Sequence, residues 1–165
     1  MRFFVIVVIS LFLLTSCKTE EELMMEVESV DLTQEGIGII ALGDFLDEDL
    51  FELTYDADNT AYHDQRTYDQ YHGDIWSVEV DRMERTIQTI IVNKRSEQFA
   101  TDKGIQVMDS EEMVMSAYGE LSYRYEDREQ QIVIIGNVDR VHQLHLRFHL
   151  YDGEVYSIWF SELEN

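Results

Sequence analysis

Apolar and polar residues alternate along most of the second half of the chain. This period of two predicts strands at about 120 to 126, 131 to 136, 142 to 151 and 154 to 161. Asp152-Gly153 separates the last two runs and is typical of a two-residue type I′ hairpin turn. The pattern therefore predicts an antiparallel meander.

A short helix is predicted immediately before this meander. The run Asp109-Ser110-Glu111-Glu112 resembles a capping box, and Gly119 is a typical residue for a helix end. The side expected to face the core consists of Met113, Val114, Ala117 and Tyr118.

The first half has a weaker pattern. Alternation predicts a first strand from Met24 to Asp31, short strands around a loop within residues 54 to 72, and strands at 74 to 81 and 86 to 93. Asp44 is a suitable N-cap for a short helix that would bury Phe45, Leu46, Leu50 and Leu53. The run Ile90-Ile91-Val92 suggests a strand buried on both faces.

The two halves share a local pattern. Gly38 to Asp44 and Lys103 to Asp109 each run from a glycine region through alternating aliphatic residues to an aspartate before a predicted helix, 65 positions apart. We therefore expect an α+β fold of two related units, each a short helix packed on an antiparallel β-meander. Their predicted bounds are 24–85 and 86–165.

The amino terminus has the pattern of a secretory signal peptide. Arg2 precedes a twelve-residue apolar run from Phe3 to Leu14, broken only by Ser10, and small residues follow at 15 and 16. A membrane-spanning helix needs about 20 apolar residues, so this run is too short to remain as a span. We expect residues 1–16 to be removed.

Leu14-Thr15-Ser16-Cys17 resembles the lipobox of bacterial lipoproteins. The resemblance implies that Cys17 becomes the acylated first residue, carrying fatty-acyl chains such as palmitate, with residues 17–23 as tether. It implies a membrane partner through the lipid anchor and a place in the cell envelope, at the outer membrane, facing the periplasm or exposed at the surface. The alternative is an ordinary signal peptide followed by an incidental cysteine. Cys17 is the only cysteine, so no internal disulfide forms.

A second resemblance covers Thr86 to Glu162. A strand, the motif T-x-K-G-I-x-V, a capped helix ending in Tyr-Gly and a meander resemble the helix-plus-four-strand unit of beta-lactamase-inhibitor-like and small outer-membrane-assembly lipoproteins. Met108 stands where those families often have glycine. The resemblance supports a fold more than a function.

Charge excludes some partners. Without residues 1–16 the chain has 11 Lys and Arg against 34 Asp and Glu, a net charge of −23. Such a surface repels nucleic acid and anionic headgroups, so we expect no nucleic-acid partner.

Three histidines, His142, His145 and His149, would suit a zinc site on a helix, but the flanking alternation predicts a strand. Residues four apart on a strand lie about 13 Å apart, too far for one zinc ion. Asp56 to Asn59 begins like a calcium loop, yet Ala61 and Thr67 stand where Gly and Glu are needed. We predict no metal and no cofactor.

No arrangement typical of nucleophilic catalysis is found, so we predict no catalytic residue and no enzyme. Carboxylate pairs are inevitable among 34 acids and indicate nothing by themselves.

The last hairpin provides the candidate site. A two-residue turn at 152–153 would pair Arg147 with Ile158 and would place Leu146 opposite Trp159 in the core below the helix. The other face would be cationic and aromatic, made of His145, Arg147, His149, Tyr156, Ile158 and Phe160. Such residues are enriched in protein-binding patches. The alternative is a second core layer, covered by the rest of the chain through Tyr62 or Trp76.

These patterns predict a non-catalytic envelope lipoprotein that binds an unknown envelope protein through a sheet face. Two other classes stay open: a structural or accessory subunit of an envelope assembly, and a small-ligand-binding protein or enzyme of unknown reaction. Exposure of Tyr156 and Phe160 would favour the binding face over the core layer.

Overall fold

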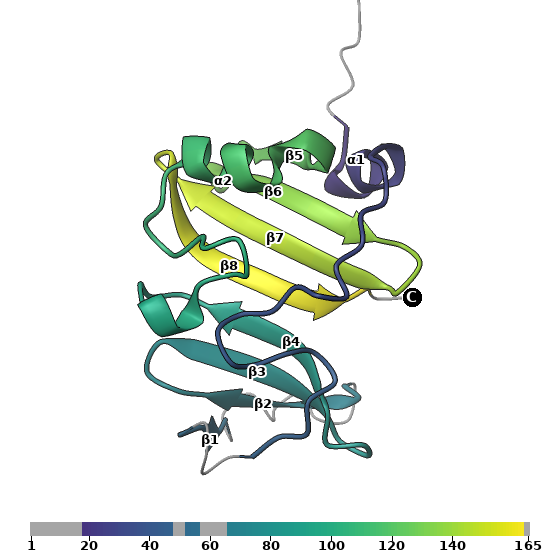
Figure 1. The fold of residues 1–165 in the computed structure, drawn as a ribbon, viewed down its shortest axis with the longest axis vertical. Coiled ribbons are helices and arrows are strands. Elements are labelled where there is room, and N and C mark those ends of the chain that lie inside the picture. The colour runs from purple at the N-terminus through teal and green to yellow at the C-terminus, as the bar shows by residue number, and fades with distance from the viewer. Residues whose placement is uncertain (1–17, 48–51, 57–65, 164–165) are drawn as a thin grey trace, which may run out of the picture.

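Eight antiparallel strands form one sheet, with a short α-helix on each of its two faces (Figure 1). The computed structural model describes residues 18–47, 52–56 and 66–163. The coarse prediction of an α+β fold is confirmed. The strands are β1 Thr54–Tyr55, β2 Tyr68–His72, β3 Trp76–Asp81, β4 Ile87–Val92, β5 Tyr123–Asp127, β6 Ile132–Asp139, β7 Leu144–Tyr151 and β8 Glu154–Glu162, and the α-helices are α1 Glu20–Glu26 and α2 Glu111–Tyr118. Two 3₁₀ turns, Glu97–Phe99 and Gly119–Leu121, complete the regular structure of this part.

The strand order is β1-β2-β3-β4-β8-β7-β6-β5. Each half of the sheet is a meander in chain order, and the last strand of each meander pairs with the last strand of the other. In this central pairing Ile90 lies opposite Phe160 and Ile91 opposite Trp159. Ile90, Ile91 and Val92 are buried, as predicted for a strand covered on both faces. In the described part of the chain, no helix is long and apolar enough to cross a membrane.

Helix α2 forms where its capping residues predict it. The Ser110 hydroxyl accepts a hydrogen bond from the Met113 amide at 3.4 Å, and the helix ends at Gly119. Val114 and Tyr118 are buried, and the Tyr118 ring packs 4.9 Å from the Phe148 ring on the face of the sheet that holds the main core. Met113 was predicted to face the core but is 48 % exposed.

The loop before α2 is held to the tip of the β7–β8 hairpin. The Met108 amide donates to the Val155 carbonyl at 2.7 Å, and the Asp109 carbonyl accepts from the Val155 amide at 2.9 Å. The Asp109 carboxylate accepts from the Gln106 amide at 2.8 Å. Met108 has a φ of 72°, a left-handed conformation that favours glycine.

The corresponding loop in the first half has the same bonds to the β3–β4 hairpin. The Gly43 amide donates to the Ile87 carbonyl at 2.8 Å, and the Asp44 carbonyl accepts from the Ile87 amide at 2.9 Å. The Asp44 carboxylate accepts from the Ala41 amide at 2.9 Å, and Gly43 has a φ of 84°. Isolated bridges follow at matching places, Phe45 with Thr86 and Ser110 with Glu154.

The prediction for the amino-terminal part of the described chain was wrong. Residues 20–26 form helix α1 instead of a tether followed by the strand Met24 to Asp31. The reason is local, because Thr19 and Glu22 form a reciprocal capping box and Glu20, Glu21 and Glu22 in the first turn suit the helix dipole.

The helix predicted to begin at Asp44 is not helical in its first turn. Residues 44–47 are extended or irregular, and Phe45, which was expected to be buried, is 69 % exposed. Leu46 and Leu53 are buried as predicted, whereas residues 48–51 lie outside the described part.

The predicted register of the last hairpin was also wrong beyond its turn. Asp152 and Gly153 both have positive φ, 52° and 82°, which agrees with a type I′ turn. Leu150 pairs with Val155, but His149 pairs with Ser157, so Tyr156 is the extra residue of a β-bulge.

Because successive side chains of a strand point to opposite faces, one extra residue exchanges the two faces of the rest of β8. Arg147 therefore lies opposite Trp159 instead of Ile158, and His145 lies opposite Ser161 instead of Phe160. Ile158 and Phe160 belong to the core on the α2 face, where they are 0 % and 1 % exposed.

Candidate functional site

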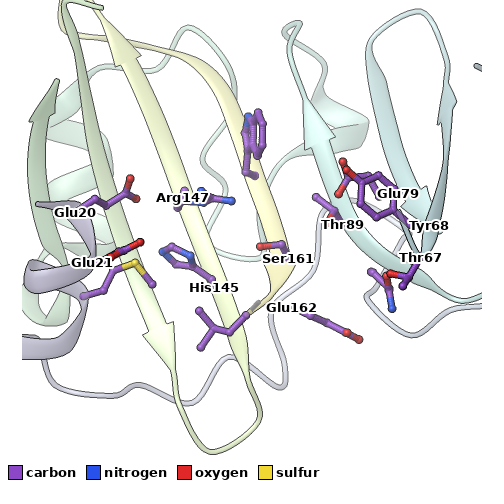
Figure 2. A pocket seen from close by; sticks show the side chains of 14 residues that line it. Glu20, Glu21, Thr67, Tyr68, Glu79, Thr89, His145, Arg147, Ser161 and Glu162 are labelled. Atoms are coloured by element: carbon purple, nitrogen blue, oxygen red, sulfur yellow. The ribbon is translucent and has the colours of Figure 1, made fainter. Parts of the chain in front are cut away.

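A cleft of about 920 Å³ lies over the face of the sheet that carries Arg147 (Figure 2). We call this face the α1 face, because α1 packs on it over β5 and β6 through Leu23, Met24 and Val27. Strands β7 and β8 form the floor of the cleft, α1 lines one side, and β2, β3 and β4 line the other.

Arg147 lies in the middle of this floor. Its guanidinium is 5.2 Å from the centre of the Trp159 ring, the residue directly opposite on β8. Its Nε atom is buried without a hydrogen-bond partner, and the side chain has no hydrogen bond or ion pair with any residue in the described part. The chain has 34 acidic residues, yet the Arg147 guanidinium forms no ion pair with any of those in the described part.

Trp159 is held by two neighbours, one of which also contacts Tyr156. Its Nε1 donates to the Ser157 hydroxyl at 3.0 Å, and the His149 ring stacks on it at 5.1 Å with an angle of 13° between the planes. Tyr156 meets His149 edge-on at 6.0 Å. Arginine and aromatic residues are enriched at the centres of binding interfaces.

A hydrogen-bond chain joins α1 to this floor. The Tyr123 hydroxyl donates to the Glu20 carboxylate at 2.6 Å, so the contact of 2.7 Å between this hydroxyl and His145 Nε2 has the histidine as donor. The other end of α1 is held by Arg140, whose guanidinium donates to the Met24 carbonyl and, at 2.7 Å, to the Val27 carbonyl. Both ends of the short helix are thereby tied to the sheet.

Burial keeps His145 in the floor, and His149 beside Trp159, neutral. It lowers the pKa of His145 to about 3, with a further contribution from the positive charge of Arg147 and from His149. Burial and Arg147 lower the pKa of His149 to about 4. Arg147 is therefore the only cation at neutral pH among the described residues that line the cleft.

Acids surround this cation. Glu20 and Glu21 come from α1, Glu79 from β3 and Glu162 from the end of β8. Burial raises the pKa of Glu162, as do the nearby charges of Asp81 and Glu84. The cleft is thus acidic at its sides and cationic at its centre, as the labelled side chains in Figure 2 show.

The structure brings together only part of the predicted face. His145, Arg147 and His149 share the α1 face, and Tyr156 is 42 % exposed beside His149. Ile158 and Phe160 do not belong to it. Trp76, suggested as a cover, instead packs against Phe99 at 5.1 Å in the main core, and Tyr62 lies outside the described residues.

Sequence reasoning missed Trp159 and Ser161. A signal for them was present, because the apolar positions of this segment change from odd at Val155 to even at Ile158 and Phe160. Such a change within one strand is what an inserted bulge residue produces.

In the part of the chain that the structure describes, His142, His145 and His149 do not converge on one point. His145 bonds to Tyr123, whereas the Nδ1 atom of His142 contacts the Asp139 carboxylate at 2.8 Å. Asp31, Asp139 and His142 do converge, with ligand atoms within 4.8 Å. However, both Asp139 oxygens already accept backbone hydrogen bonds, from Leu32 and from the turn at 141–142, which explains the cluster structurally. Cys17 and most of the calcium-like segment 56–67 lie outside the described residues.

Comparison with known proteins gives no match. No protein-family model matches the chain, and neither a curated protein nor a solved structure is significantly similar to it.

Gly136 is required for the hydrogen-bond chain that holds α1. It lies opposite Tyr123 on β6, and a methyl group there would come within 2.4 Å of the tyrosine ring and hydroxyl. We expect Gly136→Ala to displace the ring, to destabilise the fold by about 1–3 kcal/mol and to reduce amide hydrogen-exchange protection in α1. Gly36→Ala is the control, since its methyl meets only ordinary contacts. Unchanged protection of α1 in Gly136→Ala would contradict this role of Tyr123.

The depressed pKa values predict a loss of stability in mild acid. Between pH 6.5 and about 4 the unfolded chain binds protons at His145 and His149 that the folded chain does not. Each histidine then lowers the free energy of unfolding by up to about 1.4 kcal/mol per pH unit as the pH falls. In urea titrations at pH 7, 6 and 5, His149→Gln should lose less stability on acidification than the wild type. Equal slopes for His149→Gln and the wild type would argue against a neutral His149.

Proposed function

We propose that this protein is a non-catalytic, lipid-anchored protein of the bacterial cell envelope that binds another protein through the cleft on its α1 face. The observation that carries the proposal is Arg147, a cation without a polar partner in the described part, held against Trp159 in an open cleft of an acidic chain. Arginine and tryptophan are the residue types most enriched at the energetic centres of protein interfaces.

The proposal of binding without catalysis rests on the chemistry of the cleft. The histidine that lines the cleft, His145, contacts the Tyr123 hydroxyl. Burial raises the pKa of this hydroxyl, which is the opposite of activation. The histidine donates in this contact and does not act as a base. This arrangement positions α1 and favours a binding role.

The proposed anchor at Cys17 fits the position of α1. Thr19, the N-cap of α1, is only two residues after Cys17, and α1 packs beside the cleft. An acyl chain on Cys17 would therefore hold the α1 side of the sheet near an outer membrane, in the periplasm or at the surface.

We also propose that the sheet is built from two related units. The mirrored strand order supports it, as do the equivalent loops before β3–β4 and β7–β8, with the same three hydrogen bonds around Asp44 and Asp109. If the sheet consists of two such units, they join where β4 pairs with β8, and the cleft floor on β7 and β8 lies beside this pairing.

A small ligand is the second candidate occupant. The volume of about 920 Å³ falls in the range of small-molecule sites, and polar groups from several strands converge on it. If a small ligand occupies the cleft, the purified protein should still bind a small compound after all protein partners have been removed.

Crosslinking of the membrane-anchored protein tests the proposed function. Mild crosslinking followed by purification should recover a partner with the wild type, and Arg147→Gln should reduce recovery at least tenfold without changing the melting temperature by more than a few degrees. Arg128→Gln is the matched control, because Arg128 is exposed on the β5–β6 turn. Equal recovery with Arg147→Gln would remove the cleft from the proposal.

Cys17→Ala tests the anchor. Without the acylated residue, the protein should leave the membrane fraction and appear in the soluble fraction after cell lysis. A Cys17→Ala protein that still sediments with membranes would contradict the lipobox interpretation.

A further inference from the structure

We infer that the cleft on the α1 face binds an extended, positively charged protein segment that brings one carboxylate to Arg147. The inference rests on the proposed function and adds the chemical class of the partner. It follows from three properties of the cleft: an unpaired donor at its centre, acids at both sides and the distance between those sides.

The central group is a hydrogen-bond donor without an acceptor. Arg147 Nε is unpaired, and the guanidinium lies over the Trp159 ring at 5.2 Å from its centre. A guanidinium is suited to a carboxylate, which it binds through two parallel hydrogen bonds.

A free anion does not fit this cleft. Glu20 and Glu21 stand on one side of Arg147, Glu79 on the other and Glu162 at the end of the floor (Figure 2). Four acidic groups against one cation repel a small anion, and the net charge of −22 extends this repulsion to the whole molecule. The carboxylate must therefore arrive with positive charges on both sides of it.

The width of the cleft distinguishes a peptide from a small zwitterion. From β7, which carries Arg147, to β3, which carries Glu79, the sheet passes through β8 and β4. Three strand spacings of about 4.8 Å give about 14 Å, or roughly four residues of extended chain. The charges of a single amino acid lie only a few ångströms apart and cannot reach both sides. A segment with a basic residue, a central acid and a second basic residue several positions apart matches the pattern.

A random nonapeptide library displayed on phage tests this inference with the purified full chain as bait. Wild-type protein should enrich peptides that contain Asp or Glu with Lys or Arg two to four positions away on both sides. Binding of a selected peptide should weaken at least tenfold with Arg147→Gln and several-fold with Glu79→Gln, and should weaken as salt is raised. Arg128→Gln and Glu129→Gln, both exposed on the β5–β6 turn, should bind like the wild type.

A second selection tests the role of Arg147 through the sequences of the enriched peptides instead of through their affinity. With Arg147→Gln as bait, the central acid should disappear from the enriched peptides while the flanking basic residues remain. Each variant must first show the wild-type melting temperature, because only a folded bait reports on recognition.

Three results would overturn the inference: enrichment of neutral or acidic peptides, selected peptides that bind Arg147→Gln as well as the wild type, or no enrichment over the bare support. If recovery of a crosslinked partner still depends on Arg147 in these cases, the proposed function stands and only the inferred chemical class of the partner is wrong. If neither crosslinking nor peptide binding depends on Arg147, the proposed function fails as well.

Discussion

The antiparallel pairing of β4 with β8 is the contact on which the rest of the structure depends. It joins two meanders that would otherwise be separate four-stranded sheets with exposed edges, and a sheet edge with unpaired backbone groups is prone to aggregate. The four residue pairs from Thr89–Ser161 to Val92–Ile158 also serve both faces. Ile90 and Phe160 contribute to the main core, whereas Thr89 and Trp159 line the cleft. The same strand pair therefore contributes side chains to the core and to the cleft.

The two faces of the sheet differ in what covers them. The α2 face carries a continuous apolar core, which includes residues from both meanders and the loops before them. The α1 face has only a small apolar cluster under α1, around Tyr123, Ile134 and Val138, and continues into polar and aromatic residues. The apolar core on the α2 face thus supplies most of the folding stability. The α1 face can therefore carry charges and buried histidines that reduce the folding stability.

The sequence predicted those elements best in which the local capping, turn or alternation pattern agrees with the burial that the tertiary structure requires. The Ser110 cap, the Asp152-Gly153 turn and the alternation in β7 predicted their elements, because backbone geometry and burial favour the same residues there. It failed at α1, where the capping box of Thr19 and Glu22 competed with a short alternation and only one of the two patterns could be satisfied. At Asp44 a good N-cap residue is used instead to accept the Ala41 amide, a bond that depends on a loop held by β4.

For the candidate site, the strand that contributes His145, Arg147 and His149 could be predicted, but the strand opposite could not be placed correctly. The composition of β8 allows two registers, and the choice between them depends on packing of Ile158 and Phe160 below α2. The β-strand propensities of the residues cannot distinguish the two registers, because both registers place the same residues in the same strand.

The bulge at Tyr156 means that the chemistry of the cleft is encoded in the length of β8 as much as in its side chains. Loss of one residue between Val155 and Ser157 would keep the composition of the strand but offer Ile158 and Phe160 to solvent and bury Trp159. Most single substitutions on this strand change one position, whereas a single deletion would convert a polar binding surface into an exposed apolar one. This segment should therefore tolerate changes of residue type far better than changes of spacing.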